Sequence, residues 1–523
     1  MSDNSSPSTA PKHTSFAVNL GTSWIRYGLR IAVTFFLSPF LVGRIGLGVY
    51  GVWTILNSIQ GYMQLSNLGL MGGSYRYIAY YISKGDLKKL SETVNSALAI
   101  YLSIGVLLLA SAWGISQLLE TLFPAIPREM LADARIVIVL FSGCVVVGFA
   151  SSTMSQVIVA ADRFDLRNAV EIGGLLADTV GVVAVLLHGG GIVGLSVVKL
   201  VTSLTTCAAM SFCATKCAPK ITYGLKNVKV SSFKEMYSFG VFSFIGSFGS
   251  MLNLHSDSFV IGAFVGPEAV AVYSIGMMLS LQGREFVAEI YRVYTPTIYR
   301  AGARADLGEL RELLLRSSRL LMLLAVPMCV GFLTLGKEFI HLWMGDEFKE
   351  SYLVLQLLAV SQLFFLVSGM FEITLKGMGL VRPPAFASIA EGVVNMSLSI
   401  AFVGYLGFGI QSIAAATLIA AIIIRTQFIP RYTCARIKLP IMVYFRDNVI
   451  RWVACGLLFF VFCSIAVRLD LPCTWLVFFC KVSALCAIYA PIGLWVGLPK
   501  NERTQVLKTV SSGVGRLAGV FAD

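Results

Sequence analysis

The chain has 523 residues, of which 56% are hydrophobic and only 13% are charged. A soluble domain has about 45–50% apolar and about 25% charged residues, so this composition excludes a water-soluble protein. The formal net charge is +13, and anionic lipid headgroups account for basic clusters beside membrane spans, so nucleic acid is not an expected partner. We therefore predict an all-α, polytopic membrane protein whose surroundings are membrane lipids.

Apolar runs of about 20 residues, the length that crosses a bilayer, recur along almost the whole chain and are separated by short polar segments. About fourteen spans are predicted in this way. In chain order they are 16–42, 47–65, 91–117, 132–160, 169–187, 192–215, 238–265, 270–291, 313–335, 352–375, 385–405, 410–429, 449–467 and 474–496.

The spans and tails divide the chain into five predicted parts. These are a disordered cytoplasmic tail (1–15), an N-terminal six-helix bundle (16–232), a C-terminal six-helix bundle (233–432), two accessory transmembrane helices (433–497) and a cytoplasmic tail (498–523). The first tail is rich in Ser and Pro and has too few apolar residues to pack. No cleavable signal peptide is predicted.

The orientation follows from the basic residues. Most of the 41 Lys and Arg fall on one side of the membrane if the N-terminus is inside and the number of spans is even. Loops on the cytoplasmic side carry such an excess. Both termini are therefore predicted to be cytoplasmic.

The first six spans and the next six resemble one another at an offset of about 220 residues. Val42-Gly43 corresponds to Val265-Gly266, and Glu171 corresponds to Glu391. Two halves with even numbers of spans share one topology and are related by an axis along the membrane normal, as in transporters that rock two bundles. The alternative is that the halves share only their hydropathy.

Two arginines stand inside the first span. Arg26 and Arg30 are four residues apart, so they lie on one face of a helix. Each costs about 2.5–3.5 kcal/mol within a bilayer, which predicts that they face a polar cavity. Forked, permanently charged donors suit a phosphate or pyrophosphate group. The alternative is that they pair with acidic residues of other spans.

Other charged residues also fall within predicted spans. Glu171 and Asp178 are seven residues apart on one face of the fifth span, and Glu391 lies in the eleventh. Buried carboxylates of this kind can exchange a proton or bind sodium and so couple transport to an ion gradient, or they can form plain salt bridges. Arg284 in the eighth span is a third candidate for anion binding.

The eleven cysteines and four histidines are scattered, and no CxxC pair or clustered histidines suggest a metal site. No cofactor is predicted apart from a coupling proton or sodium ion. The second span runs into Asn67-Leu-Gly69-Leu-Met-Gly72-Gly73, and its counterpart runs to Pro296. Both helices are expected to break or bend there.

Four segments carry a resemblance to a known family. They are FFLSPFLVGRIGLGVYGVW (35–53), LSNLGLMGGSYRYIA (65–79), SDSFVIGAFVGPEAVAVYSIG (256–276) and YTPTIYRAGARADLGELREL (294–313). They resemble the polysaccharide biosynthesis flippases of the MOP exporter superfamily. The resemblance implies a cationic cavity between two bundles, in which Arg26 and Arg30 receive the pyrophosphate of an undecaprenyl-linked oligosaccharide. It also implies the bacterial cytoplasmic membrane, with a polysaccharide polymerase and glycosyltransferases as partners.

Other classes of function are open at this stage. Lipid II flippases resemble the same plan, but their early motif rich in Arg and Asn is missing here. Multidrug and toxin exporters hold cations with acidic residues in the first span, whereas this span has arginines and no acid, which favours an anionic cargo. A membrane-embedded glycosyltransferase or polymerase is disfavoured because the longest outer loops, 118–131 and 336–351, are short. A scaffold role is the remaining alternative.

Overall fold

The computed structural model describes residues 16–67, 69–219, 221–469 and 471–507 of the chain, and in these ranges it contains helices and no strand. The predicted tail 1–15 lies outside the described residues, as does most of the predicted C-terminal tail. The chain forms two compact units, 1–271 and 272–523, and each is treated by itself. The predicted domain boundaries stay a prediction.

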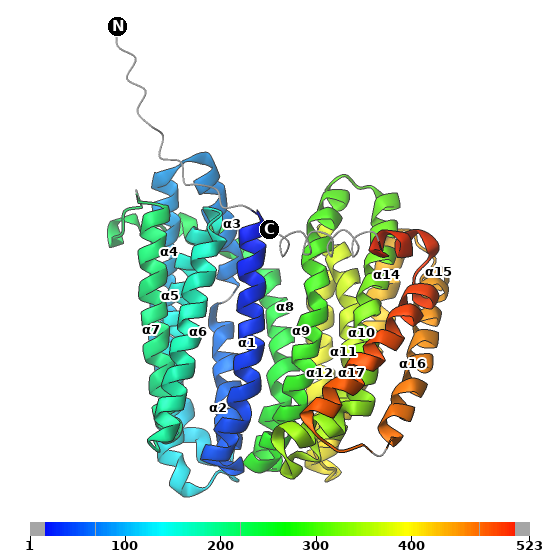
Figure 1. Cartoon of the computed structure of the whole chain (residues 1–523). Helices are drawn as coiled ribbons and strands as arrows, with labels where there is room; N and C mark the ends of the chain where they lie inside the picture. Colours follow the sequence, from blue (N-terminus) through cyan, green and yellow to red (C-terminus); the bar gives the residue numbers. More distant parts are fainter. Residues whose placement is uncertain (1–15, 68, 220, 470, 508–523) are drawn as a thin grey trace, which may run out of the picture. The chain divides into compact units, whose positions relative to one another are not determined.

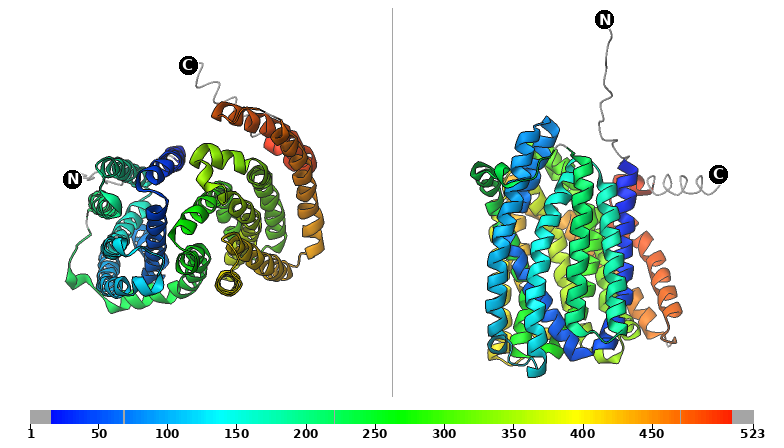
Figure 2. Two further views of the ribbon diagram at one scale, coloured as in Figure 1. Left: turned by 90° about the horizontal axis from the view of Figure 1, so that it is seen from below. Right: turned by 90° about the vertical axis from the view of Figure 1, so that its left-hand side faces the viewer.

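The first unit is built from long helices that run roughly parallel to one another (Figures 1 and 2). They are α1 (Phe16–Ile45), α2 (Leu47–Met63), α3 (Leu70–Lys84), α4 (Leu87–Leu122), α5 (Arg128–Ala160), α6 (Phe164–Leu187), α7 (Gly191–Cys217) and α8 (Val230–Phe264). Helix α5 packs against α4 and α7, while α6 packs against α7 and α1. Helix α6 is therefore the main packing partner of α1, which also contacts α2.

The second unit contains the remaining helices. They are α9 (Pro267–Ala303, whose first residues belong to the first unit), α10 (Leu307–Met344), α11 (Ser351–Gly377), α12 (Arg382–Ile400), α13 (Gln411–Ala421), α14 (Ile429–Arg436), α15 (Ile441–Tyr444), α16 (Arg451–Arg468) and α17 (Trp475–Ile492). π-Helical turns extend or join several of them, including Ile422–Phe428 between α13 and α14. Helices α16 and α17 pack against α10.

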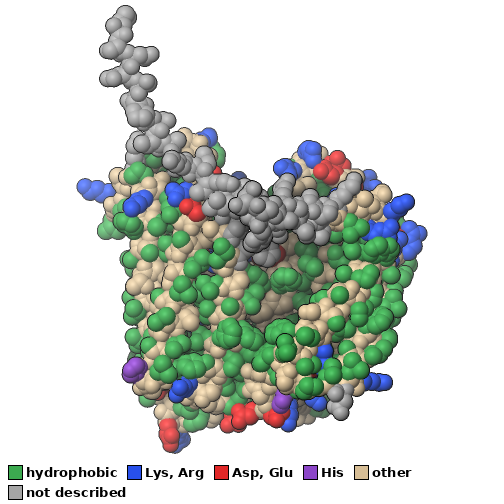
Figure 3. Space-filling model, viewed as in Figure 1, with side chains coloured by type: hydrophobic (Ala, Val, Ile, Leu, Met, Phe, Trp, Pro, Cys, Tyr) green, Lys and Arg blue, Asp and Glu red, His purple; other side chains and the backbone are tan. Residues whose placement is uncertain are grey.

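Within the described residues, eleven helical segments are long and apolar enough to cross a membrane. Hydrophobic side chains cover the sides of the molecule in Figure 3, and most charged side chains on that face gather at its upper and lower ends. The predicted all-α, multi-pass architecture is therefore confirmed. The exact number of fourteen spans stays a prediction, because α2, α8 and α9 were expected to be spans but are not among the eleven.

The second predicted span is broken as expected. Helix α2 ends at Met63, a single 3-10 turn follows, and α3 begins at Leu70. Gly69 has φ 76°, a left-handed conformation that glycine adopts without steric cost. Its counterpart α9, in contrast, continues as one helix through Pro296, so no break occurs there.

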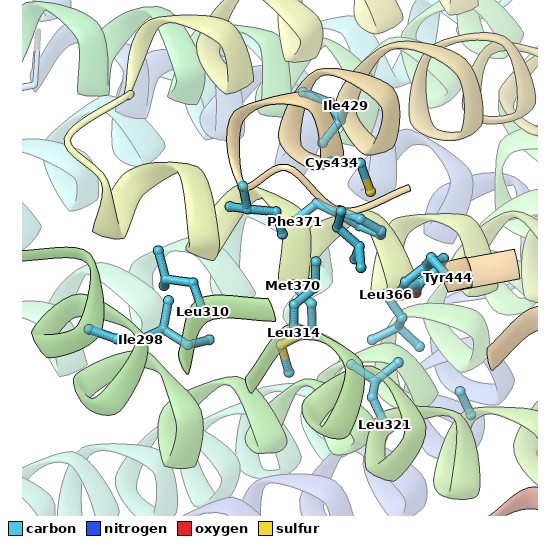
Figure 4. Packing of buried hydrophobic residues seen from close by; sticks show 14 of the residues in the cluster. Ile298, Leu310, Leu314, Leu321, Leu366, Met370, Phe371, Ile429, Cys434 and Tyr444 are labelled. Carbon is cyan, nitrogen blue, oxygen red and sulfur yellow. The ribbon is translucent and has the colours of Figure 1, made fainter. Parts of the chain in front are cut away.

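Each unit has its own apolar core. In the first unit, α3, α4, α5 and α7 enclose a cluster that includes Ile78, Val94 and Val157. In the second, Leu314, Met370 and neighbouring side chains of α9, α10, α11 and α14 interlock (Figure 4). These cores fix the helices that carry the polar groups described next.

Candidate functional site

Arg26 of α1 forms an ion pair with Glu171 of α6. Arg167, one turn before Glu171 on α6, donates from Nε to the other carboxylate oxygen at 2.8 Å. Glu171 therefore lies between two guanidinium groups, and the three side chains carry a net charge of +1. This is the alternative arrangement that the sequence left open for Arg26. The buried Nε of Arg26 has no hydrogen-bond partner in the described part of the chain.

Arg30 differs from Arg26 although both lie on one face of α1. Its side chain is exposed. No ion pair to Arg30 is formed by any described residue. An arginine in this position inside a membrane span is costly unless water or an anion reaches it. Arg30 is thus the cation of this span that is open to a ligand.

A polar cleft of about 500 Å³ lies between α5, α6 and α7 in the first unit. Its walls combine charged groups with many hydroxyl groups, and they include Ser151, Ser152, Ser155, Arg167, Glu171, Asp178, Lys199, Thr202, Ser203 and Thr206. Both acidic candidates of the fifth predicted span therefore face the same cleft, as their seven-residue spacing predicts.

Asp178 and Lys199 lie within this cleft on neighbouring helices. Asp178 Oδ1 accepts a hydrogen bond from Thr202 at 3.2 Å. The ammonium group of Lys199 donates to the Asn57 side chain of α2 at 2.8 Å, and it lies 5.1 Å from the ring centroids of both Trp53 and Phe141. Lys199 is thus held by an amide oxygen and two aromatic faces, and Asp178 by a hydroxyl group. The sequence placed both in the membrane but did not predict these partners.

The second unit contains its own buried charge cluster. Arg425, in the π-helical turn after α13, pairs with Glu372 of α11 and lies 2.6 Å from Glu391 of α12. The side chains of Arg425 and Glu391 are only 8% and 1% exposed. Glu391, a candidate for ion coupling, is thus held by an arginine of the following helical segment. Glu372 was missed because it is close to the end of its predicted span, where an acid gives no distinctive signal.

Arg284 of α9 belongs to the same neighbourhood. Its guanidinium donates to the Gln362 side chain at 3.4 Å and lies 3.8 Å from Glu285. Arg284 and Arg425 both lie over the ring of Phe365, at 5.7 and 4.6 Å from its centroid. Cation–π contacts stabilise desolvated arginines without neutralising their charge. Arg284 therefore keeps its positive charge with weaker partners than Arg425.

The two glutamates that correspond in the repeat are both paired with arginine, but not in the same way. Glu171 receives Arg26 from the first helix of its unit. Glu391 receives Arg425 from a segment that follows it in sequence. The predicted repeat aligns the two acids, but their cations come from different parts of the two units. No set of three or more His, Cys, Asp or Glu that could hold a metal is found in the described ranges.

A family model with the description "Polysaccharide biosynthesis protein" matches residues 88–353, which is just over half of the 523 residues. The chain belongs to this family. "Uncharacterized membrane protein EpsK" of Bacillus subtilis is 20% identical over 511 residues, 94% of this chain and 97% of the relative. "Putative O-antigen transporter" of Shigella flexneri is 22% identical over 370 residues, 69% of this chain and 84% of the relative.

Solved structures define the fold of this polysaccharide biosynthesis protein. The lipid II flippase MurJ in an inward closed conformation matches with a TM-score of 0.70 and 15% identity, over 91% of this chain and 98% of MurJ. An inward-facing multidrug resistance MATE family transporter of the MOP superfamily matches with a TM-score of 0.69 and 14% identity, over 81% and 98%. The predicted MATE-like fold is confirmed. The predicted resemblance to polysaccharide biosynthesis proteins agrees with the family match.

Proposed function

We propose that this protein turns an undecaprenyl-pyrophosphate-linked oligosaccharide repeat unit from the inner to the outer leaflet of the bacterial cytoplasmic membrane by alternating access. The product would enter the synthesis of a surface polysaccharide such as O-antigen, capsule or exopolysaccharide. Glycosyltransferases would supply the substrate and a polymerase would consume it. The family match supports this role. Both termini would face the cytoplasm, in agreement with the distribution of Lys and Arg.

The observation that carries the proposal is the state of Arg30. It is an exposed cation within a membrane span and forms no ion pair with a described residue. A pyrophosphate offers two anionic groups that accept from a guanidinium fork. Arg30 would be the primary contact. Arg26 would contribute positive charge while Glu171 fixes its position.

Arg284 would serve as a second anion-binding group, in the other unit. Its present partners are the neutral Gln362 and the partly exposed Glu285 at 3.8 Å. A phosphate group competes effectively with such partners because charge-assisted hydrogen bonds are about twice as strong as neutral ones. Arg425 would not take this role, because two glutamates already hold it.

Ion coupling would depend chiefly on Asp178 among the three acidic candidates. Glu171 and Glu391 are each paired with an arginine. Asp178 accepts its hydrogen bond from a neutral hydroxyl and faces the polar cleft. A carboxylate in such surroundings can take up a proton or a sodium ion.

The test is transbilayer movement of an isoprenoid-pyrophosphate oligosaccharide in proteoliposomes under imposed proton and sodium gradients. Wild type should move the lipid, and Arg26→Ala plus Arg30→Ala should abolish movement in a folded protein. Arg128→Ala is the matched control, because its side chain is 89% exposed outside the candidate cleft. If the wild type moved hydrophobic cations and not this lipid, the protein would instead be a MATE-like exporter of drugs or small molecules.

A further inference from the structure

An apolar groove of about 470 Å³ runs between α1 and α6 in the first unit. Residues from 32 to 40 of α1 form one wall, including Val33 and Phe36, and Thr179 and Val183 of α6 form the other. Phe36 is 73% exposed. The single hydroxyl of the groove, on Thr179, already donates to the backbone oxygen of Leu175 at 2.7 Å. The groove therefore offers only apolar contacts.

Arg30 lies two residues before Ala32, the first groove residue of α1. Val33 and Leu37 follow it by three and seven residues, the spacing that places side chains on one face of a helix. Arg30 and the groove residues Val33 and Leu37 therefore share one face of α1, with the charge toward its N-terminal end. This face of α1 therefore carries a cation next to apolar side chains.

We propose that the groove between α1 and α6 holds the first isoprene units of a polyprenyl pyrophosphate while Arg30 contacts its phosphate. This inference rests on the proposed function and specifies where the lipid part of the cargo lies. A free sugar phosphate would satisfy Arg30 and leave the groove unused. A neutral lipid would fill the groove and leave the charge of Arg30 uncompensated.

The groove fits only the part of the lipid next to the pyrophosphate. From Val33 to Phe40 the helix rises by about 10 Å, so most of a long isoprenoid would remain among the bilayer lipids. The isoprenoid tail gains little hydrophobic free energy by moving from the bilayer into the groove, because both are apolar. Close packing in the groove and the charge of Arg30 must therefore provide the preference for the groove. Headgroup and groove should therefore act together.

Photo-crosslinking tests this arrangement. The full-length protein in nanodiscs is irradiated with a polyprenyl pyrophosphate that carries a diazirine on the isoprene nearest the pyrophosphate, and labelled peptides are mapped by mass spectrometry. Labelling should concentrate on 32–40 and on Thr179 and Val183. Arg30→Gln should reduce it about tenfold, the effect of losing one charge-assisted contact, and Arg30→Lys should restore part of it.

A matched pair of substitutions tests the groove itself. Val183→Trp fills the groove and should lower labelling several-fold, whereas Val180→Trp should not, because Val180 is on the same helix, 69% exposed and outside the groove. Both proteins must elute as folded monodisperse species. Equal effects of the two substitutions, or labelling that Arg30→Gln leaves unchanged, would overturn the inference.

A phosphatidylglycerol that carries the same diazirine distinguishes the cargo from ordinary anionic lipid. Equal labelling of the groove by this probe would overturn the inference in favour of a bilayer lipid. The crosslinking experiment and the transport experiment can fail independently of each other. Specific labelling without lipid movement would support the groove and contradict the flippase proposal. Lipid movement that Val183→Trp leaves unchanged would support the flippase proposal and contradict the groove.

Discussion

Arg425 and Glu391 form a buried ion pair in the second unit, with 2.6 Å between their charged atoms and at most 8% of either side chain exposed. The same guanidinium also pairs with Glu372. One arginine thus joins α11, α12 and the π-helical turn that follows α13. The cluster acts as a polar cross-link inside an otherwise apolar bundle.

Removal of this arginine should destabilise the protein. Arg425→Met leaves the buried carboxylate of Glu391 without its cation, and breaking a buried pair in this way costs about 3–5 kcal/mol. A lower thermal unfolding temperature in detergent is the expected result. Arg436→Met is the control, since Arg436 is exposed on α14 and its loss should change stability by less than about 0.5 kcal/mol. Equal unfolding temperatures for wild type and Arg425→Met would contradict the cross-link.

Arg26 should contribute to the stability of the fold, and Arg30 should contribute to transport of the lipid. Arg26→Gln removes an ion-pair partner of Glu171 and should lower the unfolding temperature. Arg30→Gln should leave the unfolding temperature unchanged or raise it, because it removes an exposed intramembrane charge. Lipid transport should nevertheless fall about tenfold or more in Arg30→Gln, by loss of a charge-assisted contact. Transport at the wild-type rate in Arg30→Gln would show that the pyrophosphate binds elsewhere.

Asp178→Asn should separate transport from its driving gradient. The amide keeps the size of the side chain and can still bond to Thr202, but it cannot exchange a proton or neutralise a sodium ion. Lipid movement down its own gradient should persist while acceleration by an imposed ion gradient is lost. Asp133→Asn, an exposed acid at the start of α5, should behave like wild type. Full gradient dependence in Asp178→Asn would assign coupling to another group.

The accessory helices should depend on an ion pair with α10. Lys481 of α17 contacts both oxygens of Glu338 at 3.1 and 3.2 Å, and the side chains are 8% and 16% exposed. A double-mutant cycle of Lys481→Met and Glu338→Gln should give a coupling of about 0.5–3 kcal/mol in the free energy of unfolding. Strict additivity of the two substitutions would mean that the pair does not stabilise docking.

A second contact holds the same pair of accessory helices near the other end of α10. Arg319 pairs with Glu502, which follows α17, and also donates to Asn448 before α16. Arg319 and Glu338 are nineteen residues apart on α10, which corresponds to about 28 Å, nearly the hydrocarbon thickness of a bilayer. Helices α16 and α17 are therefore expected to move with α10.

Much of the fold is readable from the sequence. Long apolar runs with few charges predict membrane-spanning helices, because a helix satisfies all backbone hydrogen bonds within one segment in the bilayer. The all-α class and most span positions therefore follow from the sequence. The break after α2 is also predictable, because Gly69 adopts a conformation that other residues avoid. Pro296 does not break its helix, since α9 continues through it, and a bend at this position stays a prediction.

The site was predictable only in part. Helical spacing correctly indicated that Glu171 and Asp178 share a face, because the helical period fixes which residues align. It could not indicate that Arg26 pairs with Glu171 while Arg30 does not, although the two arginines are one turn apart. Nor could it find the contact between Lys199 and Asn57, which are 142 residues apart in the chain.

The sequence by itself determined that this protein is a multi-pass helical membrane protein with charged groups inside its spans, since hydropathy and helical period are local properties of the chain. Only the tertiary structure decided which of those charges are neutralised. Ion pairs depend on which helices pack together and at what depth, and the helix that neutralises a given acid can follow or precede it by more than a hundred residues. The same packing brings α6 beside α1 and so forms the groove next to Arg30.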